Sequence, residues 1–501
     1  MSEFAEPAEP AEPSQPARPL PAAAIAFALG FAGDLLIRAT PWGVNVLIGT
    51  ALLIAGVVFL MWRERPQPIG TIVFASAGAL LAAAFVAWRD SAVLSVLDVL
   101  LTILFLLFLS LGARGVEIAR AGIARIGAAL GFTAVLALPG MFRLLLSDIE
   151  WRALRPGGVG RRTLVVLRGI AIAVPMLLIF GGLLSSADAA FSALLADIFS
   201  FDIPELVGHI LRTIVLTFLA AGFLRATLWG PALPNVDRPA FLRLGAPETN
   251  IAIGLVDVMF AAFVAVQFRY FFGGADLVRV APKLTYAEYA RHGFFELVVV
   301  AALVVPILLF ASWIIDERGI ATFRVLALIQ VLCVGVMLIS AWRRMQLYVD
   351  EFGLTELRLY TTAFMIWIAA LLLWFVATVL TGNRERFFIG ALASGVAIIV
   401  ALHFINPDER IVRTNLERAA AGKRAIDMTY ATSLSADAVP SLISTLPNLP
   451  PCAARRLLNA DAERGDWRSW NASRARAHDA IETRRGELAA LAVKCQPSAR
   501  H

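Results

Sequence analysis

The stretch that decides the fold is Leu284-Thr-Tyr-Ala-Glu-Tyr-Ala-Arg-His-Gly-Phe-Phe-Glu296, after which the chain stays apolar as far as Phe310. An apolar run of this length is typical of a helix that crosses a bilayer. In the polar part, Thr285 and Glu288 have the spacing of a capping box, which satisfies two unpaired backbone N–H groups. The sequence therefore predicts a helix that begins at Thr285 and enters a membrane.

This helix would carry polar groups into the membrane on one face, at Tyr286, Tyr289 and Glu296. A carboxylate inside a span costs roughly 2.5 to 3.5 kcal/mol unless it meets a partner or water, so it is a candidate functional group by default. The alternative is that the tyrosines are interfacial anchors and that Glu296 only pairs with a neighbouring helix. The sequence leaves both interpretations open.

The composition of the 501 residues indicates a membrane protein with many spans. Hydrophobic residues make up 59% and charged residues 16% of the chain, and the mean hydropathy is +0.75, which excludes a soluble globular class. The apolar runs are continuous over about 20 residues, whereas barrel strands would alternate apolar and polar residues. We therefore predict an all-α fold, a polytopic transmembrane helical bundle.

Apolar runs predict where the spans lie. Eleven runs are long enough, at 22–37, 42–62, 69–88, 92–112, 164–185, 206–228, 249–271, 293–315, 320–342, 359–380 and 387–405. A twelfth segment, 122–146, is also apolar, but it contains Arg125, Arg143 and the pair Pro139-Gly140. We therefore expect eleven or twelve spans.

The chain divides into five regions by composition. Residues 1–21 are rich in Pro, Glu and Ala and are predicted to be a disordered extension without the basic start of a cleavable signal peptide. The other regions are a four-helix membrane region at 22–112, a basic cytoplasmic linker at 113–163 that contains 122–146, a membrane core of seven helices at 164–405, and an extracytoplasmic helical tail at 406–501.

Basic residues predict which side of the membrane each loop faces. If 122–146 lies along or dips into the inner face, the inner segments contain 19 basic residues and the outer loops contain nine, which is the positive-inside bias. If 122–146 spans, the first four spans invert and everything after residue 164 keeps its orientation. Both versions place 284–296 and the tail from Asn406 outside the cytoplasm.

The tail is predicted to form three or more amphipathic helices, over 415–430, 453–464 and 470–493. Prolines separate them, at Pro440, Pro447, Pro450 and Pro451. In an oxidising compartment Cys452 and Cys495 would be able to form a disulfide between the first residue of one helix and the end of the last. Spacing alone leaves this pairing open, and the third cysteine, Cys333, lies inside a span.

Most polar side chains inside or beside the predicted spans lie in the outer half of the bilayer, and Asp257 lies about a third of the way in from the inner side. Such groups usually face the interior of a bundle and pair with one another. They indicate a polar vestibule open to the outside, in which Glu296 would pair with Arg212 or His209. The candidate vestibule residues are Asp188, His209, Arg212, Asp257, Gln267, Tyr286, Glu288, Tyr289, Arg291, Glu296, Gln330, Arg344, Tyr348 and His403.

The outer loop at 342–360 has closely spaced charges of both signs. Gly353 suits a helix end and Thr355 suits the start of the next helix. The charges would either anchor the loop on anionic lipid headgroups or form an ion-paired lid over the vestibule. Because opposite charges are interleaved, we favour the lid.

Signatures of known catalytic sites are missing from the sequence. It contains no P-loop, no Gly-x-Ser-x-Gly, no His-Glu-x-x-His, no EF-hand loop and no Cys/His spacing of a metal site. No aromatic and basic nucleic-acid surface is evident either. We expect no cofactor, no bound metal and no nucleic-acid partner, and we do not favour an enzyme.

Several short motifs lie between about residue 160 and residue 475: Leu-Leu-Ser-Ser-Ala-Asp at 183–188, Tyr-Phe-Phe-Gly-Gly at 270–274, the opening stretch at 284–297, Arg-Met-x-Leu-Tyr at 344–348, Gly-Leu-Thr-x-Leu-Arg at 353–358, Asn-Pro-Asp at 406–408, Leu-Ser-Ala-Asp-Ala-Val-Pro at 434–440 and Asp-Trp-Arg-Ser-Trp-Asn at 466–471. As a set they resemble the bacterial multi-pass membrane proteins grouped as domain-of-unknown-function family 4173. The resemblance implies an architecture in a bacterial cytoplasmic (inner) membrane and offers no reaction to transfer.

We expect a non-enzymatic sensing or assembly component that faces the envelope and contacts the lipid bilayer and an envelope protein through its outer loops and tail. The alternative is a transporter with a polar path through the 164–405 bundle, lined by Asp257, Gln267, Glu296 and Gln330. A third interpretation is a membrane enzyme that acts on a lipid-linked substrate with Asp188, Glu288 or Glu296 as base. It is the least favoured, because no pair of carboxylates has a spacing that fixes their separation.

Overall fold

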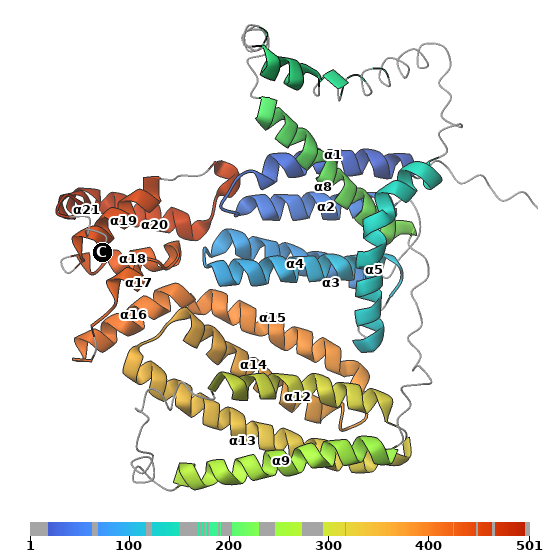
Figure 1. Cartoon of the computed structure of the whole chain (residues 1–501), viewed down its shortest axis with the longest axis vertical. Helices are drawn as coiled ribbons and strands as arrows, with labels where there is room; N and C mark the ends of the chain where they lie inside the picture. The colour runs from blue at the N-terminus through green and yellow to red at the C-terminus, as the bar shows by residue number, and fades with distance from the viewer. Residues whose placement is uncertain are drawn as a thin grey trace, which may run out of the picture. The chain divides into compact units, whose positions relative to one another are not determined.

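Helices form all the regular structure in the part of the chain that the computed structural model describes, and no strand occurs there (Figure 1). The described residues are 19–62, 69–116, 123–149, 169, 173, 176–177, 180–188, 191, 203–229, 246–272, 294–315, 317–423, 425–446, 449–462 and 466–495. The predicted all-α fold is confirmed.

Eleven helices among the described residues are long and apolar enough to cross a membrane. Ten coincide with predicted runs: α1 (Pro19–Ile37), α2 (Val44–Trp62), α3 (Ile69–Trp88), α4 (Ala92–Ala113), α8 (Ile203–Trp229), α9 (Ala246–Phe272), α12 (Phe294–Ile314), α13 (Ile320–Phe352), α14 (Glu356–Thr378) and α15 (Phe387–Ile405). The eleventh corresponds to 122–146 and combines α5 (Ile123–Arg143) with the π-helix η2 (Leu144–Asp148). Most of the predicted run at 164–185 lies outside the described residues. The predicted helix start at Thr285 also lies outside them.

The contacts group the chain into two compact units. The first contains residues 1–38, 51–66 and 133–231, and in it α1 packs along α8. A Cβ at Gly30 would lie 2.0 Å from Thr217 Oγ1, so the small residue is what allows these two helices to approach. The predicted division into five regions remains a prediction.

The second unit contains residues 39–50, 67–132 and 232–501. α3 and α4 form a hairpin, and α9, α12, α13 and α14 share a hydrophobic core. At 33 residues, α13 is about 50 Å long by its rise per residue, which exceeds a bilayer core of about 30 Å. It ends at Gly353, whose φ of 84° suits a residue without a side chain, and α14 starts after Thr355, as the sequence predicts.

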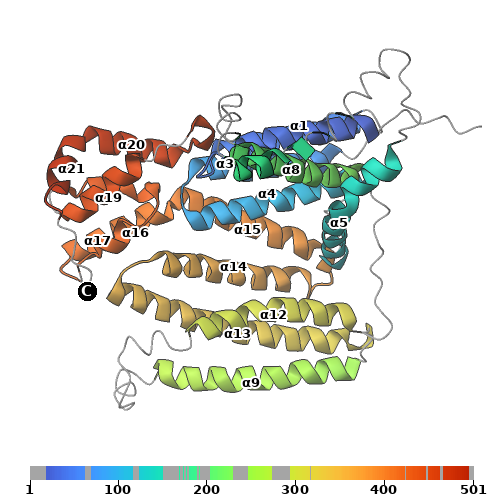
Figure 2. The same cartoon turned by 45° about the horizontal axis from the view of Figure 1, so that its top comes forward.

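The tail is a small helical domain with its own core. Its elements are α16 (Pro407–Ala420), α17 (Met428–Ala431), η6 (Ala436–Ala438), α18 (Val439–Ile443), α19 (Pro451–Ala462), η8 (Trp467–Ser469), α20 (Ala472–Thr483) and α21 (Arg485–Ala492). Buried apolar side chains from α16 to α21 pack together, and a disulfide joins Cys452 to Cys495. Both views place the tail at one end of α3, α4, α14 and α15 (Figures 1 and 2).

Candidate functional site at the Asp437 junction

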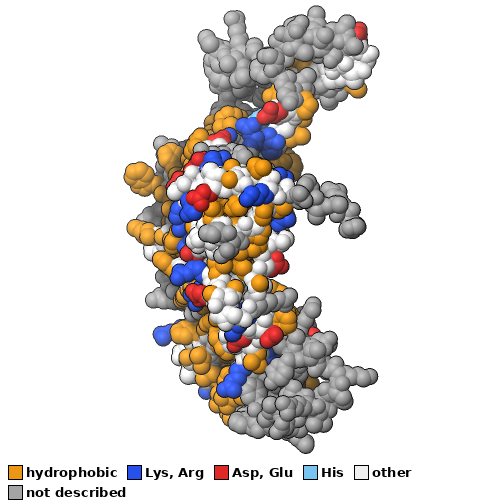
Figure 3. Space-filling view, turned by 90° about the vertical axis from the view of Figure 1, so that its left-hand side faces the viewer, with side chains coloured by type: hydrophobic (Ala, Val, Ile, Leu, Met, Phe, Trp, Pro, Cys, Tyr) orange, Lys and Arg blue, Asp and Glu red, His pale blue; other side chains and the backbone are white. Residues whose placement is uncertain are grey.

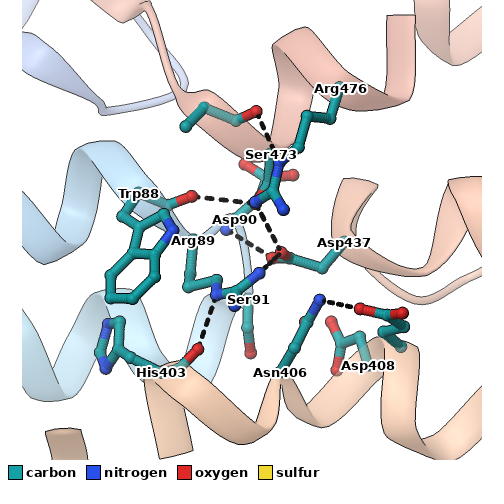
Figure 4. Close-up of polar contacts among 12 residues, drawn as sticks. Trp88, Arg89, Asp90, Ser91, His403, Asn406, Asp408, Asp437, Ser473 and Arg476 are labelled. Atoms are coloured by element: carbon teal, nitrogen blue, oxygen red, sulfur yellow. Dashed lines mark hydrogen bonds and ion pairs between the residues drawn. The ribbon is translucent and has the colours of Figure 1, made fainter. Parts of the chain in front are cut away.

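The corner between α3 and α4 consists of Arg89, Asp90 and Ser91 (Figure 4). Ser91 occupies the N-cap position of α4, but its side chain does not cap the helix. Its Oγ lies instead 2.8 Å from the Oη of Tyr360 on α14. Arg89 is only 6% exposed, which is unusual for an arginine and requires buried partners.

Arg89 finds these partners on two other segments. Its Nη1 donates to Asp437 Oδ1 at 3.0 Å, and its Nε donates to the carbonyl oxygen of His403 at 2.9 Å. The guanidinium also lies 5.0 Å from the ring centroid of Trp88. Arg89 therefore links α3 to the tail through Asp437 and to the end of α15 through His403 (Figure 4).

Asp437, in η6, is 5% exposed and has donors on both carboxylate oxygens. Oδ1 receives Arg89 and lies within hydrogen-bond distance of Ser473 Oγ, and Oδ2 receives the backbone N–H of Asp90 at 2.8 Å. Arg476 Nη2 is 4.0 Å from Oδ1. We call this set of contacts around Asp437 the Asp437 junction.

Asn471 serves two helices at once. Its Oδ1 accepts from the N–H groups of Ser473 and Arg474 at 2.9 and 3.2 Å, which caps the start of α20. Its Nδ2 donates to the carbonyl oxygens of Val86 and Arg89 at 2.8 Å each, which satisfies the end of α3. A single amide that is 2% exposed therefore fixes α20 against α3.

Asp90 ties the junction to the loop between α1 and α2. Its Oδ1 pairs with Arg474 Nη1, and its Oδ2 accepts from Ala436 N–H at 3.2 Å. Arg474 also donates to the carbonyl oxygen of Trp42 at 2.9 Å. Burial raises the pKa of Asp90, although the charge of Arg474 opposes the shift.

Asp408, in the first turn of α16, is 1% exposed. Asp408 Oδ2 accepts from the backbone N–H of Ser435 at 3.2 Å and from the hydroxyl of the same serine. Asp408 Oδ1 has no partner among the described residues. Burial raises the pKa of Asp408, and the negative charges of Asp437 and Asp90 add to the shift. Three carboxyl groups thus share one buried region with the cations Arg89 and Arg474.

The junction has the properties of a structural lock. Every carboxyl group in it accepts hydrogen bonds from the protein itself, so its charges are engaged in holding segments together. Among the described residues, no cluster of three or more His, Cys, Asp or Glu side chains could hold a metal ion.

The polar residues predicted from the sequence lie in several places. In the first unit, Arg212 Nε donates to Asp34 Oδ1 at 2.7 Å, and His209 contacts the other oxygen of Asp34 through Nδ1 and Arg38 through Nε2. Asp34 is 2% exposed and was not among the predicted residues. The exposed Asp188 belongs to the same unit. Glu296 belongs to the second unit, where it is exposed on α12.

The second unit holds the other described candidates. The structure brings together Gln267 and Arg344, whose Nη2 donates to Gln267 Oε1 at 3.2 Å. His403 is fully buried, and its Nε2 lies 3.1 Å from Asp98 Oδ2. The ring of Tyr348 stacks against the guanidinium of Arg358. Asp257 and Gln330 are buried within α9 and α13. Four candidates lie outside the described residues: Tyr286, Glu288, Tyr289 and Arg291.

Sequence reasoning missed most of the Asp437 junction. In the sequence, Arg89 is one of the nine basic residues of the outer loops and indicates only orientation, and the motifs at 434–440 and 466–471 indicate only a family resemblance. These motifs contain Asp437 and Asn471. The available signal is the Arg-Asp-Ser at 89–91, which stands between two apolar runs. If another part of the chain covers this corner, its charges need partners of opposite charge there.

A family model described as "Domain of unknown function (DUF4153)" matches residues 75–445. The matched region contains Arg89, Asp408 and Asp437 and ends before α20. The match does not confirm the specific family 4173 indicated by the motifs. No curated protein and no solved structure matches the chain.

Replacing Asp437 by Asn should release the tail from the α3–α4 corner, because Arg89 would remain buried without its counter-charge. Breaking a buried pair from one side costs about 3–5 kcal/mol. We expect chymotrypsin to cleave the tail of the detergent-solubilised variant at a clearly lower temperature than that of the unaltered chain. The matched control is Glu487→Gln, which removes an exposed pair with Arg484 and should leave the cleavage temperature unchanged. Equal cleavage temperatures for Asp437→Asn and the control would contradict the assignment.

Docking of the tail should be more stable in mild acid than at neutral pH. Asp90 and Asp408 have pKa values raised above the ordinary 3.8, so the docked state holds their protons at pH values where the released state has lost them. Stability is therefore lost as the pH rises through the raised pKa values. The urea midpoint for tail release, followed by tryptophan fluorescence, should fall as the pH rises from 4 to 7.5. The double variant Asp90→Asn/Asp408→Asn should show a smaller difference, and an unchanged pH dependence in it would refute the explanation.

Proposed function

We propose that this chain, which belongs to the DUF4153 family of unknown function, is a non-enzymatic sensing or assembly component that presents a rigidly held tail to the cell envelope. The observation that carries the proposal is the Asp437 junction, in which charged groups of the tail and of the α3–α4 corner pair with one another, and Arg89 also donates to a backbone carbonyl at the end of α15. A tail held in this way adds a structured domain to one face of a multi-pass membrane protein. It offers a surface to which a partner can bind.

The proposed location is the bacterial inner membrane with the tail outside the cytoplasm. Basic residues are more numerous in the segments predicted to be cytoplasmic than in the outer loops, which supports this orientation. The Cys452–Cys495 disulfide supports it independently, because disulfides persist in oxidising compartments. The charged corner residues of α3 and α4 face the same tail and would share its compartment.

The tail surface suits a protein partner. In Figure 3, which looks toward the tail, basic and acidic side chains are interspersed with hydrophobic ones over the described surface. Val493, which directly follows α21, is 82% exposed, and Trp467 in η8 is 69% exposed. Exposed large apolar groups among mixed charges are typical of interaction sites.

A photo-reactive amino acid at position 493 tests this function in intact cells. We expect a discrete cross-linked product with one envelope protein, and we expect Asp437→Asn to reduce its yield, because the released tail no longer holds a fixed position. The control is the same amino acid at Leu373, which is 73% exposed on the spanning helix α14 and should give lipid adducts only. A tail that cross-links no protein at position 493 would sink the proposal.

A transporter is the second candidate, and buried polar groups favour it. Asp257 is 5% exposed and Gln330 is 2% exposed. Neither carboxylate oxygen of Asp257, nor Oε1 of Gln330, has a hydrogen-bond partner in the described part of the chain. Gln330 also lines a cavity of about 400 Å³ among α9, α12 and α13. Unpaired polar groups inside spans mark ion or substrate paths in many membrane proteins.

Proton flux in proteoliposomes decides this second candidate. A transporter that uses Asp257 predicts that an imposed pH gradient decays faster with the unaltered chain than with Asp257→Asn. The variant should match protein-free vesicles, and the tail variant Glu487→Gln should match the unaltered chain. Identical decay with and without the unaltered protein would remove the proton-coupled transporter from consideration.

A further inference from the structure

A polar cavity of about 270 Å³ lies where the corner between α13 and α14 meets α16 and α17 of the tail. It is separate from the Asp437 junction and contains part of the Gly-Leu-Thr-x-Leu-Arg motif at 353–358, which the proposed function leaves unexplained. The polar side chains that line it come from both the corner and the tail: Thr355, Arg358, Asn415, Arg418, Asp427 and Tyr430.

The wall of the cavity is fixed by Gly353 and Asn415. Gly353 has a φ of 84°, and a Cβ there would lie 2.6 Å from Asn415 Oδ1 and 2.9 Å from Arg418 Nη1. Asn415 accepts from the N–H of Leu354 and donates to its carbonyl oxygen, both at 2.8 Å. The corner and α16 are therefore clamped together at the cavity's edge, and only glycine allows the approach.

Two guanidinium groups face this cavity without carboxylate partners. Arg358 stacks with its Cζ 4.0 Å from the ring centroid of Tyr348 and donates to the carbonyl oxygen of Gly353. Arg418 donates to the carbonyl oxygen of Asp350. These acceptors are neutral, and neither arginine forms an ion pair within the described ranges. The Nε of Arg418 is buried and has no acceptor there, although buried donors normally have one.

The cavity lining also contains an acid, Asp427, and a phenol, Tyr430. Asp427 is the one acid in its lining, and its carboxylate is engaged in capping α17, where Oδ1 accepts from Thr429 N–H and Tyr430 N–H. The Oη of Tyr430 accepts from Glu356 N–H at 2.9 Å, so its own proton is available to a ligand. Burial raises the pKa of this phenol, which keeps it a donor at neutral pH.

We propose that this cavity binds an oxyanion, a phosphate group, through Arg358, Arg418 and Tyr430. Guanidinium groups form strong charge-assisted hydrogen bonds with phosphate, and the N-terminus of the 23-residue helix α14 adds a favourable dipole. The phosphate is either a free anion or the headgroup of a lipid at the same membrane face. A bound phosphate would join the α13–α14 corner to the tail, so its occupancy would strengthen docking. Docking through Asp437 does not require it, so either proposal can fail alone.

The test measures chymotrypsin cleavage of the tail in the full-length protein, purified in a phosphate-free maltoside detergent. Inorganic phosphate and dihexanoyl phosphatidylglycerol are compared with chloride at equal ionic strength. At ten times its dissociation constant, a ligand that binds only the docked state should slow cleavage about tenfold. Protection by phosphate identifies a free anion as sufficient, whereas protection by the lipid alone identifies a headgroup.

Variants locate the site. Arg358→Gln and Arg418→Gln should each abolish the protection, and Arg413→Gln, which changes an exposed arginine of α16 outside the cavity lining, should retain it. The comparison of phosphate with chloride on the unaltered chain needs no variant, so a variant that fails to fold does not decide the result. Chloride protecting as well as both phosphate probes would overturn the proposal, and so would loss of protection in Arg413→Gln equal to that in Arg418→Gln.

Discussion

The buried ion pair between Arg89 and Asp437 is the interaction on which the arrangement of tail and bundle depends. Arg89 is 6% exposed and Asp437 is 5% exposed, so each has lost the water that would stabilise its charge. Their attraction repays this cost only because further donors and acceptors complete the site, from Asp90, Ser473 and the carbonyl oxygen of His403. A tail docked in a shifted position would leave one of these charges buried without its partner, so one docked position is strongly preferred.

The junction explains how a polar domain is fixed to an apolar bundle. The apolar spans bury few charges, and the polar groups that must be satisfied lie at the helix corners, where backbone groups lack intrahelical partners. Asn471 satisfies the end of α3 and the start of α20 with one amide, and Asp90 links η6, α20 and the loop after α1. The tail therefore completes the ends of the spanning helices, and these ends determine where the tail lies.

The sequence predicts the local features of this structure well and its long-range pairs poorly. Apolar runs of about 20 residues reveal the spans, because hydrophobic length is a property of one segment, and Gly353 marks the end of α13 for a similarly local reason. Arg89 and Asp437 are 348 positions apart, and His403 meets Asp98 across 305 positions. A charge pattern shows that such groups need partners, but it does not show which partners the packing supplies.

A double-mutant cycle on Arg89 and Asp437 tests the central claim most directly. The variants Arg89→Met, Asp437→Leu and the double variant would be compared with the unaltered chain by the urea midpoint for tail release. If the two charges stabilise each other, the double variant is more stable than either single variant, because no unpaired charge remains buried. If the effects of the two substitutions simply add, Arg89 and Asp437 act independently and the account of the junction is wrong.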